Sequence, residues 1–493
     1  MAFAMVLITV FSACSFIYPH NPWDDANVYM TIGNAMLAGR ELYVDIFDHK
    51  GPVLFFMHEW SAMLSRNSFI VIYLIELLCC FVYLFNSLRT IRLFSSSTMT
   101  LPLVLLLGVI TYSSDFFSYG DSVEEFSLPI LAHSLYHMLR FAKEGRLPRW
   151  RQALTMGIGL GLILWMKFNI LFFYIGGTAA LAFISWRYRQ LAELGRVVLW
   201  VSAGVLIVTL LVLCYFLAHG TMDALFDAYF MVNLFQYHGG ATNGEPDFWW
   251  FPLIKLGIWL VTVLPLIFLP AKWEVKTLLW GTYGLLMLSF ATMTVQFYYF
   301  LLCFAFFPML ICYCPDMRRT KRKLVTMVAV AVLAAGTNWN LVTLLNGTFP
   351  RCVFEMAEII NANTSEDSEV LTFSSYDTGI YQHTRHLPPN SNFFLSSILD
   401  PAIRQEQAAW VASGKVKYLV REIGAVKTCH EYYEVPVPDN YKLVYDKEEL
   451  FRYRFITTPH KFLWNLTYPR VLLRYVMEPV TLNQRMQVYE RQP

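Results

Sequence analysis

The sequence is poor in charge for its length. Asp, Glu, Lys and Arg make up 15% of its 493 residues, whereas hydrophobic residues make up 56% and the mean hydropathy is +0.44. Soluble globular domains usually carry about 25% charged residues. The chain also lacks a basic arm and a Lys/Arg-rich aromatic patch, which argues against nucleic acid as a partner. Scarce charge, together with recurring apolar runs of about 20 residues, predicts a polytopic α-helical membrane protein.

Cysteine patterns typical of metal sites are also missing. The nine cysteines form no CxxC motif and no His-rich spacing accompanies them, so a structural zinc site is not predicted. Most of them lie in apolar runs, where a thiol behaves as a small hydrophobe. Cys352 and Cys429 instead fall in the polar C-terminal part. They could pair if that part faces an oxidising compartment, and the sequence leaves this open.

Apolar runs recur along the first 345 residues and predict about eleven transmembrane helices. The N-terminal run has no basic start and no small-residue cleavage site, so we interpret it as the first span and not as a signal peptide. The runs lie near residues 2–18, 67–88, 100–114, 126–142, 152–168, 170–186, 197–218, 251–270, 277–295, 298–314 and 324–345.

Lys and Arg are concentrated in every second loop. With a cytoplasmic N-terminus, the loops that face the cytoplasm are 89–99, 140–151, 187–196, 271–276 and 315–323. The opposite side, before the C-terminal region, holds only Arg40, Lys50, Arg66 and Lys167. The positive-inside rule therefore predicts a plasma-membrane protein in this orientation. Counting 53–64 as a span would invert every later loop, so this short segment is predicted to be an interfacial helix.

The composition changes after residue 345, where the chain becomes mixed and polar. EVLTFSS and KYLVREI predict buried strands, and KLVYDKEELFRYRF predicts a hairpin or strand pair. RCVFEMAEIINA and SSILDPAIRQEQAAWVAS predict helices, and FLWNLTYPRVLLRYVM predicts an interfacial helix in the tail. We expect a transmembrane domain over 1–345, with a long first outer loop over 19–66. An extracytoplasmic α/β domain with its tail is expected over 346–493.

Acids and lysines gather at a few short places between the apolar runs. The predicted topology puts DDANVY, DIFDHKGP, GDSVEEF and WMKFN at the same outer membrane face. Charge at this depth is costly and usually has a partner or a task. Sugar transfer from a lipid phosphate needs both kinds of residue. A carboxylate takes the proton of the acceptor hydroxyl, and a lysine stabilises the charge that develops on the leaving phosphate.

The stretch WDDANVYMTIGNAMLAGRELYVDIFDHKGP resembles the first outer loop of bacterial GT-C glycosyltransferases of the family-39 type. These are relatives of protein mannosyltransferases and of the aminoarabinose transferase of lipid A. Many carry an Asp and then G-x-x-x-Y-x-D-x-x-D-x-K-G-P. That pattern reads here Gly39, Tyr43, Asp45, Asp48, Lys50, Gly51 and Pro52. GDSVEEFSLP resembles their glycine-to-Glu-Glu motif, and LWMKFN resembles their lysine near the end of the fifth span.

The resemblance covers residues 1–345 and implies a GT-C fold. It also implies inverting transfer of a hexosyl or pentosyl unit from a polyprenyl-phosphate donor to an extracytoplasmic glycan, lipid or protein of the cell envelope. Asp25 best matches the family's loop Asp and would be the general base, with Asp24 as the alternative. Lys50 and Lys167 would bind the donor phosphate.

A second acidic site near the acceptor is implied for Glu124, Glu125 and Asp121, the last standing where relatives often have Asn. Further candidates in the loops are Tyr43, Asp45, Asp48, His49, Tyr237 and His238. No cofactor is required by this chemistry. Oxygen ligands such as those of Asp25 and Glu124 are compatible with Mg²⁺ or Mn²⁺, so the metal requirement stays open.

Each of these residues also has a purely structural interpretation. Asp is a favoured helix cap and turn residue, lysines snorkel to headgroups, and Glu124 with Glu125 would suit the start of a helix. For the whole chain, the alternative function is transport or flipping of a lipid-linked sugar. Transporters carry charge near the midplane within inverted repeats. Here the charges fall on one face and no repeat is evident, which favours the enzyme. A non-catalytic anchoring protein would leave the pairing of acids with lysines unexplained.

Overall fold

The computed structural model describes residues 1–236, 266–291, 297–312, 320–336, 338–346, 351–365, 369–373, 375–384, 386–394, 401–424, 436–452 and 482–492. The chain divides into two compact units, each assembled from separate segments. Unit 1 comprises Met1–Ser12, Tyr73–Tyr215 and Trp249–Leu341. Unit 2 comprises Ala13–Ile72, Phe216–Phe248 and Val342–Pro493.

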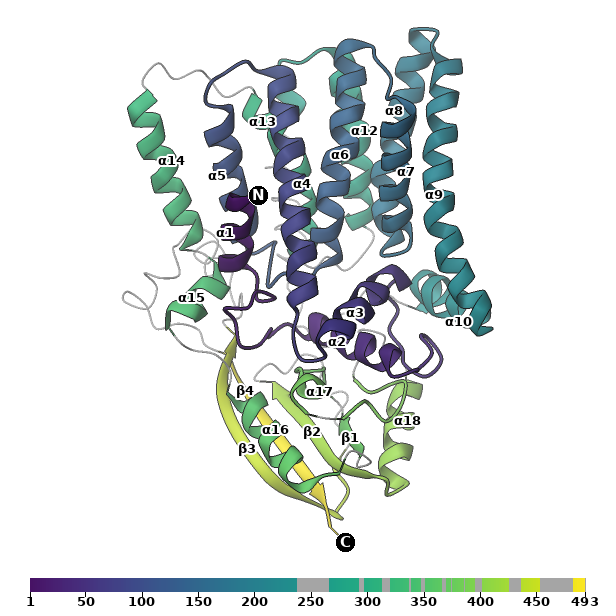
Figure 1. Cartoon of the computed structure of the whole chain (residues 1–493), viewed down its shortest axis with the longest axis vertical. Helices are drawn as coiled ribbons and strands as arrows, with labels where there is room; N and C mark the ends of the chain where they lie inside the picture. The colour runs from purple at the N-terminus through teal and green to yellow at the C-terminus, as the bar shows by residue number, and fades with distance from the viewer. Residues whose placement is uncertain are drawn as a thin grey trace. The chain divides into compact units, whose positions relative to one another are not determined.

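Unit 1 consists of apolar helices (Figure 1). They are α1 (Ala2–Phe11), most of α4 (Ile70–Phe94), α5 (Thr100–Ser113), α6 (Val123–Glu144), α7 (Trp150–Leu164), η1 (Phe168–Ile170), α8 (Leu171–Arg187), most of α9 (Leu191–His219), α12 (Trp273–Ala291), η3 (Phe297–Ala305), α13 (Phe307–Cys312), α14 (Thr320–Ala335) and the start of α15 (Trp339–Asn346). The predicted apolar runs form helices over most of their described residues, but the first run is helical only over Ala2–Phe11, and residues 12–18 form turns. Most of the run at 251–270 lies outside the described residues, so the number of spans stays a prediction.

Three helices in the described part of the chain are long and apolar enough to cross a membrane, namely Ile70–Phe94, Phe168–Arg187 and Leu191–His219. On α9, Leu199 and Leu211 expose 67% and 69% of their surface. Large apolar side chains that are exposed to this extent are costly in water. Lipid is therefore the solvent that suits this face.

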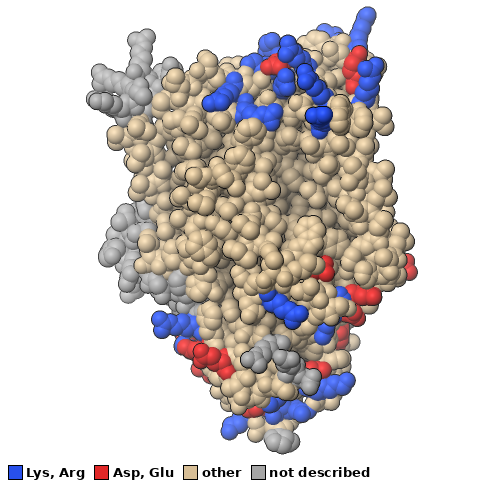
Figure 2. All heavy atoms as spheres, in the orientation of Figure 1, with Lys and Arg blue, Asp and Glu red and all other residues tan. Residues whose placement is uncertain are grey.

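Basic side chains gather at one end of the unit 1 helices. Figure 2 shows Lys and Arg clustered where α6 is followed by α7 and α8 is followed by α9. The loops at 140–151 and 187–196, both predicted to be cytoplasmic, share this end. The arrangement is the one that the positive-inside rule requires, and the orientation itself stays a prediction.

Unit 2 carries a four-stranded sheet in the order β1-β2-β4-β3. β1 (Glu369–Thr372) runs parallel to β2 (Val416–Gly424), and β4 (Leu482–Arg491) runs antiparallel to both β2 and β3 (Tyr441–Arg452). α16 (Cys352–Asn363) packs on β3, and α17 (Ile380–His383) and α18 (Pro401–Ala412) lie in the connection between β1 and β2 (Figure 1). Unit 2 also contains α10 (Met222–Leu225) and the π-helix η2 (Phe226–Gln236).

The α/β character predicted for the C-terminal part is confirmed, and β1, β2, α16 and α18 form where they were expected. The hairpin predicted within KLVYDKEELFRYRF is wrong for the described residues, because the stretch up to Arg452 belongs to a single strand, β3, whose partner is β4. β4 was not predicted from the sequence, because few of its side chains are apolar. Met486 and Val488 are its fully buried apolar residues among those described. The predicted tail helix and Cys429 lie outside the described residues, so neither that helix nor the disulfide with Cys352 is addressed.

Two helices of the first loop, α2 (Asp24–Leu37) and α3 (Pro52–Leu64), pack against each other in unit 2. Their contact is close enough that a Cβ on Gly33 would lie 2.5 Å from the carbonyl carbon of His58. Only glycine fits there. The helix predicted over 53–64 is present as α3. Pro52 occupies its first position, where the missing N–H of proline costs nothing.

Polar bonds join α2 to the C-terminal part of unit 2. The hydroxyl of Thr31 donates to Asp377 Oδ2 at 2.7 Å, and the Gln382 amide donates to Asn27 Oδ1 at 3.0 Å. All four side chains are at most 1% exposed. These partners explain why α2 can bury polar residues on nearly every face, since buried polar groups need hydrogen bonds.

Asp377 should make unit 2 less stable as pH rises. Burial raises the pKa of this carboxyl from 3.8 to about 6. The hydrogen bonds that it accepts from Thr31 and from the Gly379 N–H act in the opposite direction and lower the pKa. The folded chain keeps a proton that the unfolded chain loses, so stability falls between about pH 4 and pH 6. A shift of about two pKa units corresponds to about 3 kcal/mol.

Asp377→Asn does not titrate, and it should therefore gain stability relative to wild type between pH 4 and pH 7. Thermal unfolding of the full chain in detergent at both pH values measures the difference. The exposed Asp439→Asn is the control for losing one negative charge. A gap between wild type and Asp377→Asn that stays constant with pH would contradict the prediction.

Candidate active site

The DIFDHKGP motif folds into a tight group of charges in unit 2. Asp48 is 2% exposed, and its Oδ1 accepts the His49 N–H at 2.7 Å and lies 2.9 Å from His49 Nδ1. The ammonium of Lys50 lies 3.8 Å from Asp48 Oδ2 and 5.4 Å from the centre of the Tyr29 ring. An acid, an imidazole and an ammonium are thus consecutive in sequence and in contact.

The charged side chains of this group shift one another's pKa values. Burial by itself would raise the pKa of Asp48, but Lys50 and His49 outweigh it and hold that pKa well below its usual range. Burial lowers the pKa of His49, and the Lys50 charge lowers it further, while Asp48 and Asp25 act in the opposite direction. Asp48 is therefore an anion that neutralises part of the lysine charge. The effect of Asp25 on the imidazole also places the predicted base near this group.

Asp24 and Asp25 occupy the first turn of α2, and both are half-buried. The N-cap of that helix is Trp23, and no side-chain hydrogen bond caps it. Neither acid is therefore the capping residue that a purely structural interpretation would require. The positive end of the helix dipole still favours a negative charge at both positions.

The remaining loop candidates divide into support and turn residues. Tyr43 has a left-handed φ of 68°, and its hydroxyl donates to the Lys50 carbonyl at 2.6 Å. Asn233 of η2 donates its amide to the His49 carbonyl at 2.6 Å. Both side chains hold the backbone of the charged group in place. Asp45 is exposed and accepts the Glu41 N–H at 2.9 Å, as a turn residue does.

In unit 1, the structure pairs two residues that lie more than forty positions apart. Lys167 Nζ donates to Glu124 Oε1 at 2.6 Å, and their side chains are 15% and 2% exposed. The same ammonium lies 3.7 Å from the centre of the Tyr299 ring. A buried charge is tolerable only with such partners, and a snorkelling lysine would not need them.

Asp121 and Glu125 lie at the turn before α6 and take part in its hydrogen bonds. Oxygens of Glu125 and of Glu76 on α4 both accept the Asp121 N–H, at 3.0 Å and 2.8 Å. Ser122 caps α6 by accepting the Glu125 N–H at 3.0 Å. Two buried carboxylates that share one donor would repel each other if both were ionised.

Gly120 is required by the same turn. Its φ is +89°, and a Cβ there would lie 2.4 Å from Glu76 Oε1 and 2.4 Å from Ser12 Oγ. The GDSVEE motif is therefore a turn that closes over Glu76 and presents Glu124 to Lys167. Glu76 lies within an apolar run, and the sequence around it gave no sign that it belongs to this motif.

The structure thus brings Asp48, His49 and Lys50 together in unit 2, with Asp25 close enough to act on the charge of His49, and joins Glu124 to Lys167 in unit 1. Tyr237 and His238 lie outside the described residues. Tyr299 escaped the sequence analysis because it looks like any aromatic residue of an apolar run. In the described part of the chain, no group of three or more His, Cys, Asp or Glu could hold a metal ion.

No protein-family model and no curated protein matches the chain. Solved structures do. ArnT from Cupriavidus metallidurans bound to undecaprenyl phosphate is 11% identical over 98% of this chain and 97% of its own, with a TM-score of 0.58. Its apo state is 11% identical over 98% and 96%, with a TM-score of 0.59. ArnT, the aminoarabinose transferase, is a GT-C glycosyltransferase.

The chain has the GT-C fold. The predicted fold class and the predicted resemblance are thereby confirmed, and the similarity extends over nearly the whole of both chains. The apo oligosaccharyltransferase of Archaeoglobus fulgidus is also similar, with 10% identity over 99% of this chain and 88% of its own and a TM-score of 0.48.

Proposed function

We propose that this GT-C chain is an integral-membrane glycosyltransferase that takes a hexosyl or pentosyl unit from a polyprenyl-phosphate donor. The acceptor is a glycan, lipid or protein of the cell envelope on the extracytoplasmic side. The observation that carries the proposal is the fold, shared from end to end with ArnT, whose structure holds undecaprenyl phosphate. The charged group at Asp48, His49 and Lys50 supports it, because it offers an ammonium to an anion.

The chemistry follows from the charges. Asp25, with Asp24 as the alternative, removes the proton from the acceptor hydroxyl. The hydroxyl oxygen then forms a bond to the anomeric carbon from the face opposite the phosphate, which inverts the configuration there. The bond from that carbon to the phosphate oxygen breaks, and the lipid phosphate leaves with the electron pair. Lys50 stabilises the charge that it gains.

Lys167 and Glu124 remain candidates for contacts to donor and acceptor. Their mutual bond at 2.6 Å means that a substrate group would have to share or replace it. A divalent cation at Glu124 would meet the same obstacle, since Lys167 already supplies the positive charge that Mg²⁺ or Mn²⁺ would bring. The roles proposed for Asp25 and Lys50 need no metal.

The decisive experiment compares the glycans of the cell envelope by mass spectrometry in three strains. The gene is deleted in one, restored as wild type in the second, and restored as Asp25→Asn in the third. A sugar that vanishes on deletion and returns only with wild type identifies both the reaction and the sugar. Unchanged glycans on deletion would refute the transferase, and accumulation of the complete donor on the cytoplasmic side would indicate a flippase.

Lys50→Gln should weaken binding of undecaprenyl phosphate by about 10–100-fold, because a hydrogen bond to a charged group contributes about 1.5–3 kcal/mol. Titration of the full chain in nanodiscs measures the affinity. Lys442→Gln, which removes an exposed lysine from β3, is the matched control. The unfolding midpoint is recorded as well, because Asp48 loses a partner. Equal affinities of a folded Lys50→Gln and wild type would remove Lys50 from the donor site.

A further inference from the structure

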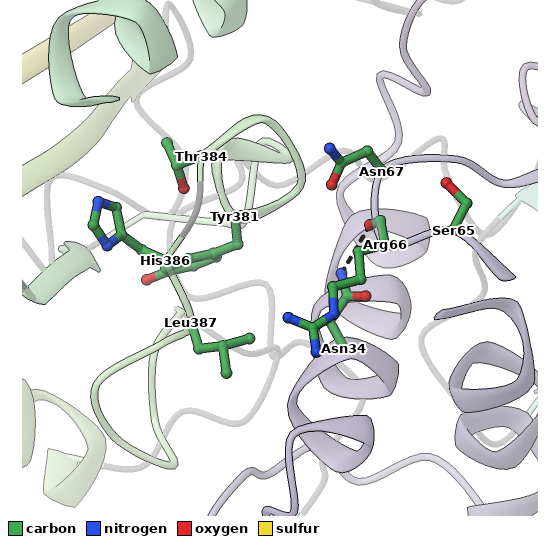
Figure 3. A pocket seen from close by; sticks show the side chains of 8 residues that line it. All are labelled: Asn34, Ser65, Arg66, Asn67, Tyr381, Thr384, His386 and Leu387. Atoms are coloured by element: carbon green, nitrogen blue, oxygen red, sulfur yellow. Dashed lines mark hydrogen bonds between the residues drawn. The ribbon is translucent and has the colours of Figure 1, made fainter. Parts of the chain in front are cut away.

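A cavity lies within unit 2, and none of Asp48, His49 and Lys50 lines it. Its volume is about 370 Å³, which falls in the range of about 300–1,000 Å³ that small-molecule sites occupy. Figure 3 shows its two walls. Asn34 of α2 and Arg66, which follows α3, form one wall, and Thr384, His386 and Leu387 of the C-terminal part face them.

The cavity is lined mostly by polar side chains, and part of its lining is buried. Asn34, Thr384 and His386 are only 4%, 7% and 4% exposed. Within the described residues, neither Asn34 Oδ1 nor Thr384 Oγ1 has a hydrogen-bond partner. Unsatisfied buried oxygens cost about 1–3 kcal/mol each. A ligand with hydroxyl groups, which can both donate and accept, would suit a polar lining of this kind.

Arg66 adds a positive charge to the same wall. Its side chain is exposed and lines the cavity. Asn34 Nδ2 donates to the Arg66 carbonyl at 3.0 Å, which fixes the arginine backbone beside the cavity (Figure 3). The guanidinium remains able to take a carboxylate or phosphate, whose geometry it matches.

We infer that this cavity binds an acidic saccharide, with Arg66 on its anionic group and Asn34 and Thr384 on its hydroxyls. The saccharide would belong to the acceptor, a role that rests on the proposed glycosyl transfer. The binding itself does not rest on it.

The test is a titration of the full chain in nanodiscs by calorimetry. The probes are cellobiouronic acid and cellobiose, which differ in one group, a carboxylate in place of a hydroxymethyl group, together with inorganic phosphate. Cellobiouronic acid should bind at least tenfold tighter than cellobiose and than phosphate. Arg66→Gln should abolish the preference, whereas Lys442→Gln should leave it intact. Thr384→Val should weaken both disaccharides several-fold without removing the preference for the acid.

Three outcomes would overturn the inference. They are no saturable binding of either disaccharide, binding that Arg66→Gln leaves unchanged, and phosphate binding as tight as that of the acidic disaccharide, which would mark a simple anion site. Undecaprenyl phosphate is titrated into the same variants. Its binding should not change in Arg66→Gln, so failure at this cavity is distinguishable from failure of the proposed function.

Discussion

Asp25→Asn should lower the turnover of glycosyl transfer by about 10²–10⁴-fold, the share that a positioned general base usually contributes. Asparagine keeps the shape of the side chain but cannot take the proton of the acceptor hydroxyl. Binding of the donor should change little, because the proposal assigns the phosphate to Lys50. The donor sugar identified from the envelope glycans is supplied on its polyprenyl phosphate, and turnover and donor affinity are measured separately.

Two neighbouring acids provide the controls for this result. Asp24→Asn removes the other acid in the first turn of α2, and Asp45→Asn removes an exposed turn residue that accepts a backbone N–H. Both should retain most of the activity. A loss confined to Asp24→Asn would transfer the role to Asp24. Full activity in both Asp24→Asn and Asp25→Asn would exclude a loop Asp as the base.

The helices of unit 1 were predictable because their signal is local. An apolar run of about 20 residues must satisfy its backbone within the segment, and the helix does this. The GDSVEE and WMKFN motifs were also visible as charge in apolar surroundings. Their opposite charges made an ion pair between Glu124 and Lys167 conceivable. Neither motif shows how far apart the two side chains lie in the fold, so the bond between them could not be predicted.

The polar interior of α2 could not be predicted for a related reason. Thr31 and Asn27 look like residues of a solvated face, yet both are buried because Asp377 and Gln382 bond to them from about 350 positions later in the chain. The cavity beside Arg66 has the same origin, since its walls come from two distant segments of unit 2. Sequence patterns reveal the periodicity of one segment, whereas these features arise where segments meet.

The pair of Glu124 and Lys167 should dominate the stability of unit 1 in a way that a double-mutant cycle can measure. Removing one member of a buried ion pair costs about 3–5 kcal/mol, because the other charge stays behind. Lys167→Met leaves a carboxylate that is 1% exposed. Glu124→Gln leaves an ammonium that still contacts the Tyr299 ring, a contact that contributes up to about 2 kcal/mol. Lys167→Met should therefore be the more destabilising change.

The double variant, Glu124→Gln with Lys167→Met, should be more stable than Lys167→Met alone, because no unpaired charge remains. Unfolding of the full chain in detergent gives the coupling energy. The partly exposed pair of Arg140 and Glu144 is the matched control, at side-chain exposures of 32% and 34%, and should couple by only about 0.3–0.5 kcal/mol. Additive effects at Glu124 and Lys167 would mean that water screens the pair, and both residues would then be free to meet a substrate directly. Strong coupling with lost activity in the stable double variant would show instead that the charges serve the reaction as well as the fold.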